Sequence, residues 1–537
     1  MQKVPTKPNL FNKLLEWAKG NKKTLEDVID TISKSQPELK CILERPEKLP
    51  VDTTLNWVGR EKELEDLLKL TLTNVERYTR QVATKQLYSI PLVHGGMGLG
   101  KSRLGIELFR KLKELHEQNK PCKLSPTKKD LRFQEAFDDI AHVFIDFSTI
   151  DELDMHHEGR LPSSILLGLR VACHFFFGCP LDAIRLSSEE QSMFLFSNVL
   201  DLISKRHVKK GLLLLIQLDE FPHVDQEILN KMIGEISGQM ISKHERKICV
   251  LPFLTGTATQ VGVQAIKTSK MPLKSIPLLP LSTNEVNQLL SITLKPSRKN
   301  PLFSQAVDSL GGVPRFFQFF LEHFKSSDQY SGKKIQQKLC SVVEQIAKSY
   351  DTEKWNNLLH SEVGVRTMLL WALAGKEVGL KDMLNGISVE DARDTGILML
   401  EPVSNSREKY TLKVPLALLR AINLGLNDIE DSYLDPIPGV DDRAFERAMN
   451  GLRLLRQKLF VKAGRKKATY RELYPHALGY AEDLDQEVNL KELQEVLVDG
   501  SSARHESIHK YPLDAIPVQR FKTPTVNAAV SSLLQFR

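Results

Sequence analysis

Cysteine is scarce in this chain of 537 residues, which contains six. None belongs to a CxxC pair, and none has a Cys/His spacing that suits zinc, which argues against a disulfide scaffold and against a structural zinc site. Cys249 lies within an apolar run and is expected to be a small buried hydrophobe. This cysteine usage is typical of proteins kept under reducing conditions.

Long apolar runs are also absent. No stretch reaches the roughly 18 consecutive apolar residues that a membrane-spanning helix needs. Charges interrupt residues 1–23, which do not form a conventional signal peptide. No internal repeat or low-complexity segment is evident. We therefore expect a soluble, intracellular protein of the cytoplasm or nucleus with no membrane partner.

The composition is that of a globular protein, with 41% hydrophobic and 26% charged residues. At roughly 150 residues per domain, the length allows about three or four domains. Lys and Arg number 74 against 67 for Asp and Glu, which gives a net charge of +7. A surplus this small indicates a partner only where it is concentrated, so its distribution along the chain matters.

Apolar runs alternate with helical patterns from residue 88 onward. Such runs predict strands buried on both faces, as in a parallel sheet covered by helices, and therefore an α/β fold. The predicted strands are 88–94, 143–147, 212–218, 248–254 and 276–281, and helices are expected from Lys101, over 165–176 and over 194–203.

Residues 95–102 read GGMGLGKS and match G-x-x-x-x-G-K-[ST] between an apolar strand and an amphipathic helix. The glycines let successive backbone N–H groups converge on phosphate oxygens, and the helix N-terminus adds positive potential. Lys101 is expected to reach the β and γ phosphates of ATP, and Ser102 to place its hydroxyl on Mg²⁺. The alternative is a glycine-rich turn that binds nothing. The predicted nucleotide-binding residues of this segment are Gly95, Gly96, Met97, Gly98, Leu99, Gly100, Lys101, Ser102 and Arg103.

Two carboxylates follow the aliphatic run that starts at residue 212. Ligands bind open α/β sheets at the carboxyl ends of the strands. Asp219 is therefore expected to hold the Mg²⁺ shell, and Glu220 to orient or deprotonate the attacking water. A solvated turn can also carry two acids, but it does not explain the unbroken aliphatic run before them.

Three weaker signals fit the same site, and each has a plain structural alternative. Thr255 or Thr257 could contact the γ-phosphate or simply end a strand. Arg315, near the start of a helix, could sense the charge of the nucleotide or lie on the surface. Gly59 and Arg60 could line the adenine pocket or start a helix. The predicted catalytic residues are Lys101, Glu220 and Arg315.

Together these motifs resemble the STAND and AAA+ class of P-loop ATPases. The resemblance is carried by residues 58–61 (VGRE), the loop 95–102, the acids 219–220, residues 312–315 (GVPR) and a winged-helix pattern after them. Within that class the motifs are similar, over about residues 51–425, to the ATPase module of Crinkler-type effectors and of retrotransposon hot spot proteins. The resemblance implies a nuclease-like or kinase-like domain after the ATPase. It also offers secretion into a host cell as the alternative localisation, although no ubiquitin-like header precedes the ATPase here.

The predicted organisation is a P-loop NTPase parallel sheet with a helical lid and a winged-helix domain, plus mostly helical termini. Thr24 and Asp27 resemble a capping box that opens a helix near the N-terminus, and Ser282 with Glu285 is expected to cap the helix that follows the strand 276–281. The winged-helix pattern comprises short helices over 367–373, over 380–384 and before Gly396, then a hairpin of 397–402 with 409–414. The expected segments are an N-terminal helical segment (1–45), the NTPase core (51–290), the lid (291–360), the winged-helix-like domain (361–425) and a basic C-terminal segment (440–537).

Most of the net charge lies in residues 441–475, which contain ten basic and four acidic residues. Apolar residues at helical spacing there leave a basic face, the kind of footprint that a nucleic-acid backbone selects, although an ordinary solvated helix face is the alternative. The strand-borne Asp and Glu-x-Lys set of a restriction-type nuclease is not convincing after Tyr474. We therefore interpret the segment 440–537 as an incomplete nuclease-like domain or a basic tail.

The sequence favours a Mg²⁺-dependent ATPase that acts as a regulatory switch in a Crinkler-like effector. ATP, Mg²⁺, DNA or RNA through 441–475, and a nucleotide-dependent oligomer are the predicted cofactors and partners. A nucleic-acid-binding module with the P-loop as a ligand-gated scaffold is the first alternative. A truncated ATPase–nuclease fusion and an inactive paralogue are the others.

Overall fold

The computed structural model describes residues 24–35, 40–44, 55–117, 136–148, 161–179, 192–241, 246–257, 270–293, 301–324 and 332–350. It also describes shorter stretches, at 371–372, 377–384, 387–394, 399–403, 409–426, 457, 460–461, 466–469 and 487–490. Most of the helix expected over 367–373, the turn of the predicted hairpin and most of the basic segment 441–475 lie outside the described residues.

The chain divides into two compact units. Unit 1 comprises Met1–Thr53, Arg60–Gly95 and Gly100–Leu278. Unit 2 comprises Thr54–Gly59, Gly96–Leu99 and Leu279–Arg537. Within the part of the chain that the structure describes, no helix is both long enough and apolar enough to cross a membrane.

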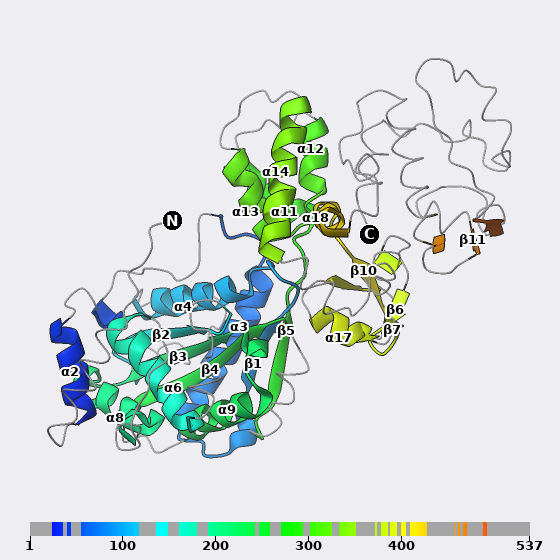
Figure 1. The fold of residues 1–537 in the computed structure, drawn as a ribbon. Helices are drawn as coiled ribbons and strands as arrows, with labels where there is room; N and C mark the ends of the chain where they lie inside the picture. Colours follow the sequence, from blue (N-terminus) through cyan, green and yellow to red (C-terminus); the bar gives the residue numbers. More distant parts are fainter. Residues whose placement is uncertain are drawn as a thin grey trace, which may run out of the picture. The chain divides into compact units, whose positions relative to one another are not determined.

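A five-stranded parallel sheet forms the core of unit 1 (Figure 1). Its strands are β1 (Ile90–His94), β2 (Asp139–Asp146), β3 (Leu212–Asp219), β4 (Ile248–Gly256) and β5 (Leu273–Pro277), in the spatial order β2-β3-β4-β1-β5. Every residue of β3 and β4 is buried, as expected for aliphatic strands covered on both faces. The predicted α/β fold with a parallel sheet is confirmed.

One strand lies earlier in the chain than the sequence predicts. The strand expected over 276–281 is β5, which starts at Leu273 because it pairs with β1 along the whole length of that strand, from Ile90 opposite Leu273 to His94 opposite Pro277. The pairing ends where β1 ends, and Leu278 then donates its N–H to His94 O at 2.8 Å.

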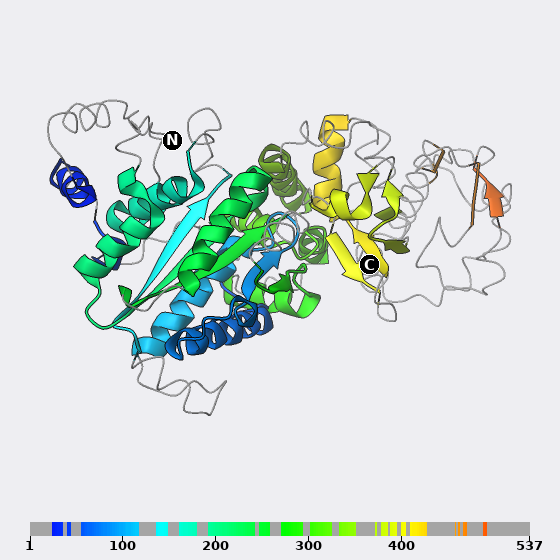
Figure 2. The same ribbon diagram turned by 90° about the horizontal axis from the view of Figure 1, so that it is seen from below.

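Helices cover both faces of the sheet (Figures 1 and 2). On one face α4 packs against β2, β3 and β4, and α3 packs against α4 and β4. On the other, α9 packs against β4 and α6, and α8 packs against α6. Their bounds are α3 (Glu61–Thr79), α4 (Lys101–Glu117), α6 (Ser163–Ala172), α8 (Phe196–His207) and α9 (Gln226–Met240). Short turns of 3₁₀- or π-helix are η1 (Ile42–Glu44), η2 (Lys85–Leu87), η4 (Cys173–Phe177), η5 (Ser192–Phe194) and η6 (Phe221–His223).

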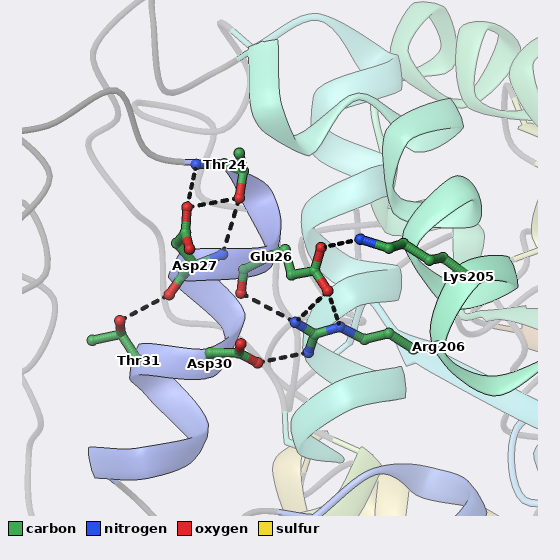
Figure 3. Close-up of polar contacts among 7 residues, drawn as sticks. All are labelled: Thr24, Glu26, Asp27, Asp30, Thr31, Lys205 and Arg206. Atoms are coloured by element: carbon green, nitrogen blue, oxygen red, sulfur yellow. Dashed lines mark hydrogen bonds and ion pairs between the residues drawn. The ribbon is translucent and has the colours of Figure 1, made fainter.

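The N-terminal helix of the described residues, α2 (Leu25–Ser35), packs against α8. Its predicted capping box is confirmed, because Asp27 N–H donates to Thr24 Oγ1 at 3.3 Å and Thr24 N–H donates to Asp27 Oδ2 at 2.9 Å. Figure 3 shows how Glu26 faces Lys205 and Arg206 of α8, with contacts of 2.6 and 3.2 Å. The buried apolar residues of α2 and these ion pairs thus both attach the helix to the rest of unit 1.

The helical part of unit 2 is built around α14 (Gly332–Tyr350), which packs against α12 (Pro301–Asp308), α13 (Pro314–His323) and α18 (Leu416–Leu426). Phenylalanine rings fill its centre, with Phe320 stacked on Phe324 at 4.0 Å and in contact with Phe303 at 5.4 Å between ring centroids. Helix α11 (Thr283–Thr293) precedes this group. Its predicted cap is present, because Ser282 N–H donates to Glu285 Oε2 at 2.5 Å.

Unit 2 also contains a small antiparallel sheet in the order β6-β10-β9. Its strands are β6 (Glu377–Gly379), β9 (Met399–Pro402) and β10 (Lys409–Lys413), and the predicted hairpin of β9 with β10 is confirmed. The predicted helix before Gly396 is α17 (Val389–Asp394). Two short pairs complete the strands, β7 (Met383–Leu384) with β8 (Ile387–Ser388) and β11 (Lys467–Thr469) with β12 (Glu487–Asn489).

The short helix predicted over 380–384 is wrong. The spacing of Leu380, Met383 and Leu384 fits one helical turn, but Asp382 forms a tight turn with Gly379 instead. Gly379 N–H donates to Asp382 Oδ2 at 2.9 Å, and Asp382 N–H donates to Gly379 O at 3.1 Å. An aspartate that bonds to a nearby backbone N–H competes with helix formation, and the chain continues into the β7–β8 pair.

Candidate functional site

Three polar residues from neighbouring strands lie side by side at the carboxyl edge of the sheet in unit 1. Asp146 at the end of β2 is opposite Asp219 of β3, and Asp219 is opposite Thr255 of β4. Thr255 is in turn opposite Val93 of β1, two residues before the glycine-rich loop. Because β4 lies between β1 and β3, Thr255 lies between the strand that leads into the loop and the strand that carries the acids.

The glycine-rich loop connects β1 to α4, as the sequence predicts. Gly98 and Gly100 have φ angles of 77° and 91°, in the region that only glycine adopts easily, so the path of the loop depends on these two residues. Leu104 N–H donates to Gly100 O at 3.0 Å and so closes the first turn of α4. The loop therefore delivers Lys101 and Ser102 to a helix N-terminus, where backbone N–H groups favour anions.

Lys101 and Glu220 face each other at this edge. The ammonium nitrogen of Lys101 lies 3.6 Å from Glu220 Oε1, and the Lys101 side chain is only 4% exposed. Glu220 has φ 46° and ψ 40°, a left-handed conformation that non-glycine residues rarely adopt. This conformation turns the chain sharply after β3. The lysine of the loop and the second acid of the predicted pair are thus brought together.

Asp219 forms hydrogen bonds with the hydroxyls of Ser102 and Thr255, so the first acid is tied to both α4 and β4. Burial raises the pKa of Asp219 above its ordinary value, and the negative charges of Glu220 and Asp146 raise it further. Of these three carboxylates Asp219 is buried and the other two are half-buried, and Lys101 contacts Glu220. Such a concentration of negative charge favours the binding of a cation.

The donor atoms here are oxygens, which suits Mg²⁺. The Ser102 hydroxyl and the Asp219 carboxylate are hydrogen-bonded to each other, so the two proposed oxygen donors lie together. Within the described stretches, His, Cys, Asp and Glu side chains never gather in the groups of three that a metal cage needs.

The middle of the loop, Gly96–Leu99, groups with unit 2. Arg315 donates its backbone N–H to Gly98 O at 3.1 Å, and the Tyr350 hydroxyl donates to Met97 O at 2.9 Å. A Cβ at Gly98 would lie 2.7 Å from the Tyr350 hydroxyl and 2.8 Å from Arg315 Cβ. The structure thus brings the predicted Arg315 next to the loop and starts its helix, α13, at Pro314.

The remaining predicted site residues lie within α4 and at or just before the start of α3. Arg103 forms an ion pair with Glu107 within α4 at 3.3 Å. Arg60 lies at the N-terminus of α3, 4.0 Å from Glu63, and is 5% exposed. Gly59 has φ 68° and closely approaches a side chain of α11. A role for Gly59 and Arg60 at the adenine ring stays a prediction, as does a contact of Thr255 or Thr257 with the γ-phosphate.

Sequence reasoning missed four residues at or behind the site. Asp146 ends β2, and its significance comes from its position opposite Asp219. Gln217 interrupts the aliphatic run of β3, a signal that could have been noticed, because a lone amide in a buried strand needs partners. His142 is buried beside Gln217. Tyr350 carries no local signal, since its contact with Met97 joins residues far apart in the sequence.

The chain matches no protein-family model and no curated protein. Several solved structures resemble it in fold. The Aeropyrum pernix ORC2 protein, solved in ADPNP–ADP complexes, has 12% identity and a TM-score of 0.39, covering 72% of this chain and 96% of that chain. The Aeropyrum pernix ORC1 protein in complex with DNA has 13% identity and a TM-score of 0.34, covering 70% and 95%. CDC6P from Pyrobaculum aerophilum has 13% identity and a TM-score of 0.31, covering 71% and 97%. At these TM-scores the likeness gives no information about the function of this chain.

Proposed function

We propose that this protein binds ATP with Mg²⁺ and hydrolyses it. The observation that carries the proposal is the arrangement at the carboxyl edge of the sheet. The proposal is supported by the 3.6 Å contact of Lys101 with Glu220 and by the hydrogen bonds of Ser102 and Thr255 to Asp219, which join the end of the glycine-rich loop to the pair of acids. A glycine-rich turn without a ligand gives no reason for the buried Lys101 to contact Glu220 beside the buried Asp219.

Each of these residues has a role in the proposed reaction. Lys101 would neutralise charge on the β and γ phosphates, released from its contact with Glu220. Ser102 and Asp219 would hold Mg²⁺, which supplies charge neutralisation at the phosphates when bound. Glu220 would then orient the attacking water and accept its proton, as a positioned carboxylate can. Arg315 is proposed as the residue that senses the charge of the nucleotide.

A regulatory switch is the finer form of the proposal. Residues 96–99 of the phosphate-binding loop group with unit 2, where Met97 and Gly98 accept hydrogen bonds from Tyr350 and Arg315. A change in the loop on phosphate binding is therefore expected to alter these contacts. Assignment to a Crinkler-like effector rests only on the resemblance of the motifs.

The test is steady-state ATP turnover by the full chain, with and without Mg²⁺. Lys101→Ala is expected to abolish detectable nucleotide binding, whereas Glu220→Gln should retain binding and lose turnover by a factor of about 10² or more. Lys111→Ala is the matched control, because Lys111 lies on the same helix with a side chain that is 42% exposed and paired with Glu114. Turnover that is equal in Lys101→Ala and Lys111→Ala would refute the proposal.

Nucleic-acid binding is a second candidate function, favoured by the concentration of basic residues in 441–475. Of these residues, Lys466 and Lys467 are described, and both are exposed at or next to β11. Binding to duplex DNA should weaken steeply as salt rises, and neutralising Arg453, Arg456, Arg465 and Lys466 together should reduce that slope. Equal salt slopes in the wild type and the neutralised variant would exclude this role for the segment.

A further inference from the structure

A buried hydrogen-bond network lies directly behind the candidate site, on the face of the sheet that α4 covers. Gln217 of β3 is fully buried and is two residues before Asp219, so both side chains project from the same face of the strand. Its amide contacts three partners on three different elements. These are Ser102 O of α4 at 3.2 Å, Thr255 Oγ1 of β4 at 3.2 Å and His142 Nε2 of β2 at 3.0 Å.

One of these contacts fixes the direction of all the others. A backbone carbonyl can only accept a hydrogen bond, so the group of Gln217 that faces Ser102 O must be the amide nitrogen. Its second hydrogen then points to Thr255 Oγ1. The Thr255 hydroxyl accepts that bond and directs its own hydrogen to Asp219 Oδ1. The amide oxygen of Gln217 faces His142 Nε2, which must therefore carry a hydrogen.

The surroundings of His142 fit this assignment. Its ring is 6% exposed and lies 5.4 Å from the ring of Phe109 between centroids. Burial lowers the pKa of His142 to about 4, so the imidazole is neutral near pH 7 and carries one N–H. A neutral ring that donates from Nε2 is a hydrogen-bond partner for the Gln217 amide oxygen, and Ser102 O is a partner for the amide nitrogen. The orientation of the amide is therefore set by both of its ends.

Helix α4 has a glycine at the point where the Gln217 amide approaches it. Gly105 lies inside α4, where glycine costs about 1 kcal/mol relative to alanine. A Cβ at Gly105 would lie 2.0 Å from Gln217 Oε1 and 2.5 Å from Phe253 Cε1, far inside van der Waals contact. The phosphate-binding motif does not require glycine at this position. Its presence is explained by the space that the Gln217 side chain occupies.

We propose that Gln217, oriented by His142, is a positioning residue that sets the geometry of the Mg²⁺-binding groups. Its amide donates to the backbone oxygen of Ser102 and to the Thr255 hydroxyl, whose own hydrogen is directed to Asp219, so one amide contacts both residues that hydrogen-bond to Asp219. Gln217 itself is not a proposed metal ligand. The proposal deepens the proposed ATPase function and rests on it, except for the hydrogen-bond network itself, which can be tested without nucleotide.

The first experiment reads the network directly. The full chain, labelled with ¹⁵N in histidine, is compared with His142→Gln to assign the ring signals of His142. The network requires a neutral His142 ring protonated at Nε2 at pH 7, and Gln217→Met should shift the Nε2 signal because its acceptor is lost. A ring protonated at Nδ1 alone, or an Nε2 signal unchanged in Gln217→Met, would overturn the assignment.

The second experiment measures the Mg²⁺ concentration that gives half-maximal ATP turnover. Gln217→Met, which keeps the length of the side chain without its hydrogen bonds, should raise this concentration about tenfold, as expected when a group that orients a metal ligand is lost. Thr255→Val should have a similar effect, and the double variant should be no worse than the more affected single variant, because Gln217 acts largely through Thr255. Gly105→Ala should repeat the shift by displacing the amide.

Asn74→Leu is the matched control. Asn74 is another buried amide, in α3, that donates to Ser89 O at 2.7 Å away from the site. It should lower thermal stability without changing the Mg²⁺ dependence. If Gln217→Met behaves as Asn74→Leu does, or if the effects of Gln217→Met and Thr255→Val add in full, the positioning role is refuted. If the wild type hydrolyses no ATP, the proposed function fails separately, and the His142 signals still decide whether the network exists.

Discussion

His142 offers a stability prediction that can be worked through from the structure. The residue is buried on β2 with its ring against Phe109 of α4, and burial lowers the pKa of His142 to about 4, with a smaller lowering from His174. The hydrogen bond to Gln217 acts in the opposite direction and raises the pKa, but burial prevails. In the unfolded chain the ring returns to its ordinary pKa of 6.5. The folded state therefore binds fewer protons than the unfolded state between about pH 4 and pH 6.5.

The sign and size of the effect follow from this difference. Because the unfolded state takes up a proton that the folded state refuses, the contribution of His142 to stability is present above about pH 6.5 and is lost as the pH falls toward 4. Each pH unit within this window is worth up to about 1.4 kcal/mol. Between pH 7 and pH 5 the loss from this one residue amounts to about 2 kcal/mol.

The assay compares urea unfolding of the wild type and His142→Gln at several pH values. Glutamine does not titrate, and its amide can still donate a hydrogen bond toward Gln217, so the variant removes the proton linkage while retaining a donor. The free energy of unfolding of the wild type should fall by about 2 kcal/mol more than that of His142→Gln between pH 7 and pH 5. Parallel pH dependences in the two proteins would show that the ring is not held neutral by burial.

Three further predictions rest on separate features. Gly98→Ala should weaken ATP binding more than Gly100→Ala in equilibrium titrations, because both have positive φ but only a Cβ at Gly98 meets Tyr350 and Arg315; equal losses would contradict this. Burial raises the pKa of Asp308 to about 6, so the wild type loses stability as the pH rises from about 4 to 6. In urea unfolding, Asp308→Asn should therefore raise the free energy of unfolding by about 1–2 kcal/mol at pH 7 and leave it unchanged below pH 4. Glu26→Gln should increase the amide hydrogen exchange of α2 at low salt and much less at high salt, because salt screens the ion pairs of Glu26 with Lys205 and Arg206. An increase that does not depend on salt would show that these ion pairs do not attach α2.

The parts of the fold that sequence predicts well are those set by neighbouring residues. The glycine-rich loop, the two acids after β3 and the capping boxes at Thr24 and Ser282 are local patterns, and the structure places each at the element the pattern indicates. The aliphatic run from residue 212 predicts a strand buried on both faces for the same reason. The short helix over 380–384 fails because apolar spacing over five residues fits a turn as well as a helix.

The rest depends on strand order and register, which no local pattern contains. Asp146 matters because β2 pairs with β3, and Thr255 contacts Asp219 because β4 lies on the other side of β3. Gln217 is visible in the sequence as a lone amide in an apolar run, yet its three partners come from three separate elements. Tyr350 is likewise brought to Met97 only by the packing of unit 2.

The most direct test of the proposed ATPase function is ATP hydrolysis by the purified full chain, measured beside its Lys101→Ala, Glu220→Gln and Lys111→Ala variants. We expect Mg²⁺-dependent turnover in the wild type and in Lys111→Ala, binding without turnover in Glu220→Gln, and neither in Lys101→Ala. Failure of the wild type to bind or hydrolyse ATP, or turnover that survives in both Lys101→Ala and Glu220→Gln, would contradict it.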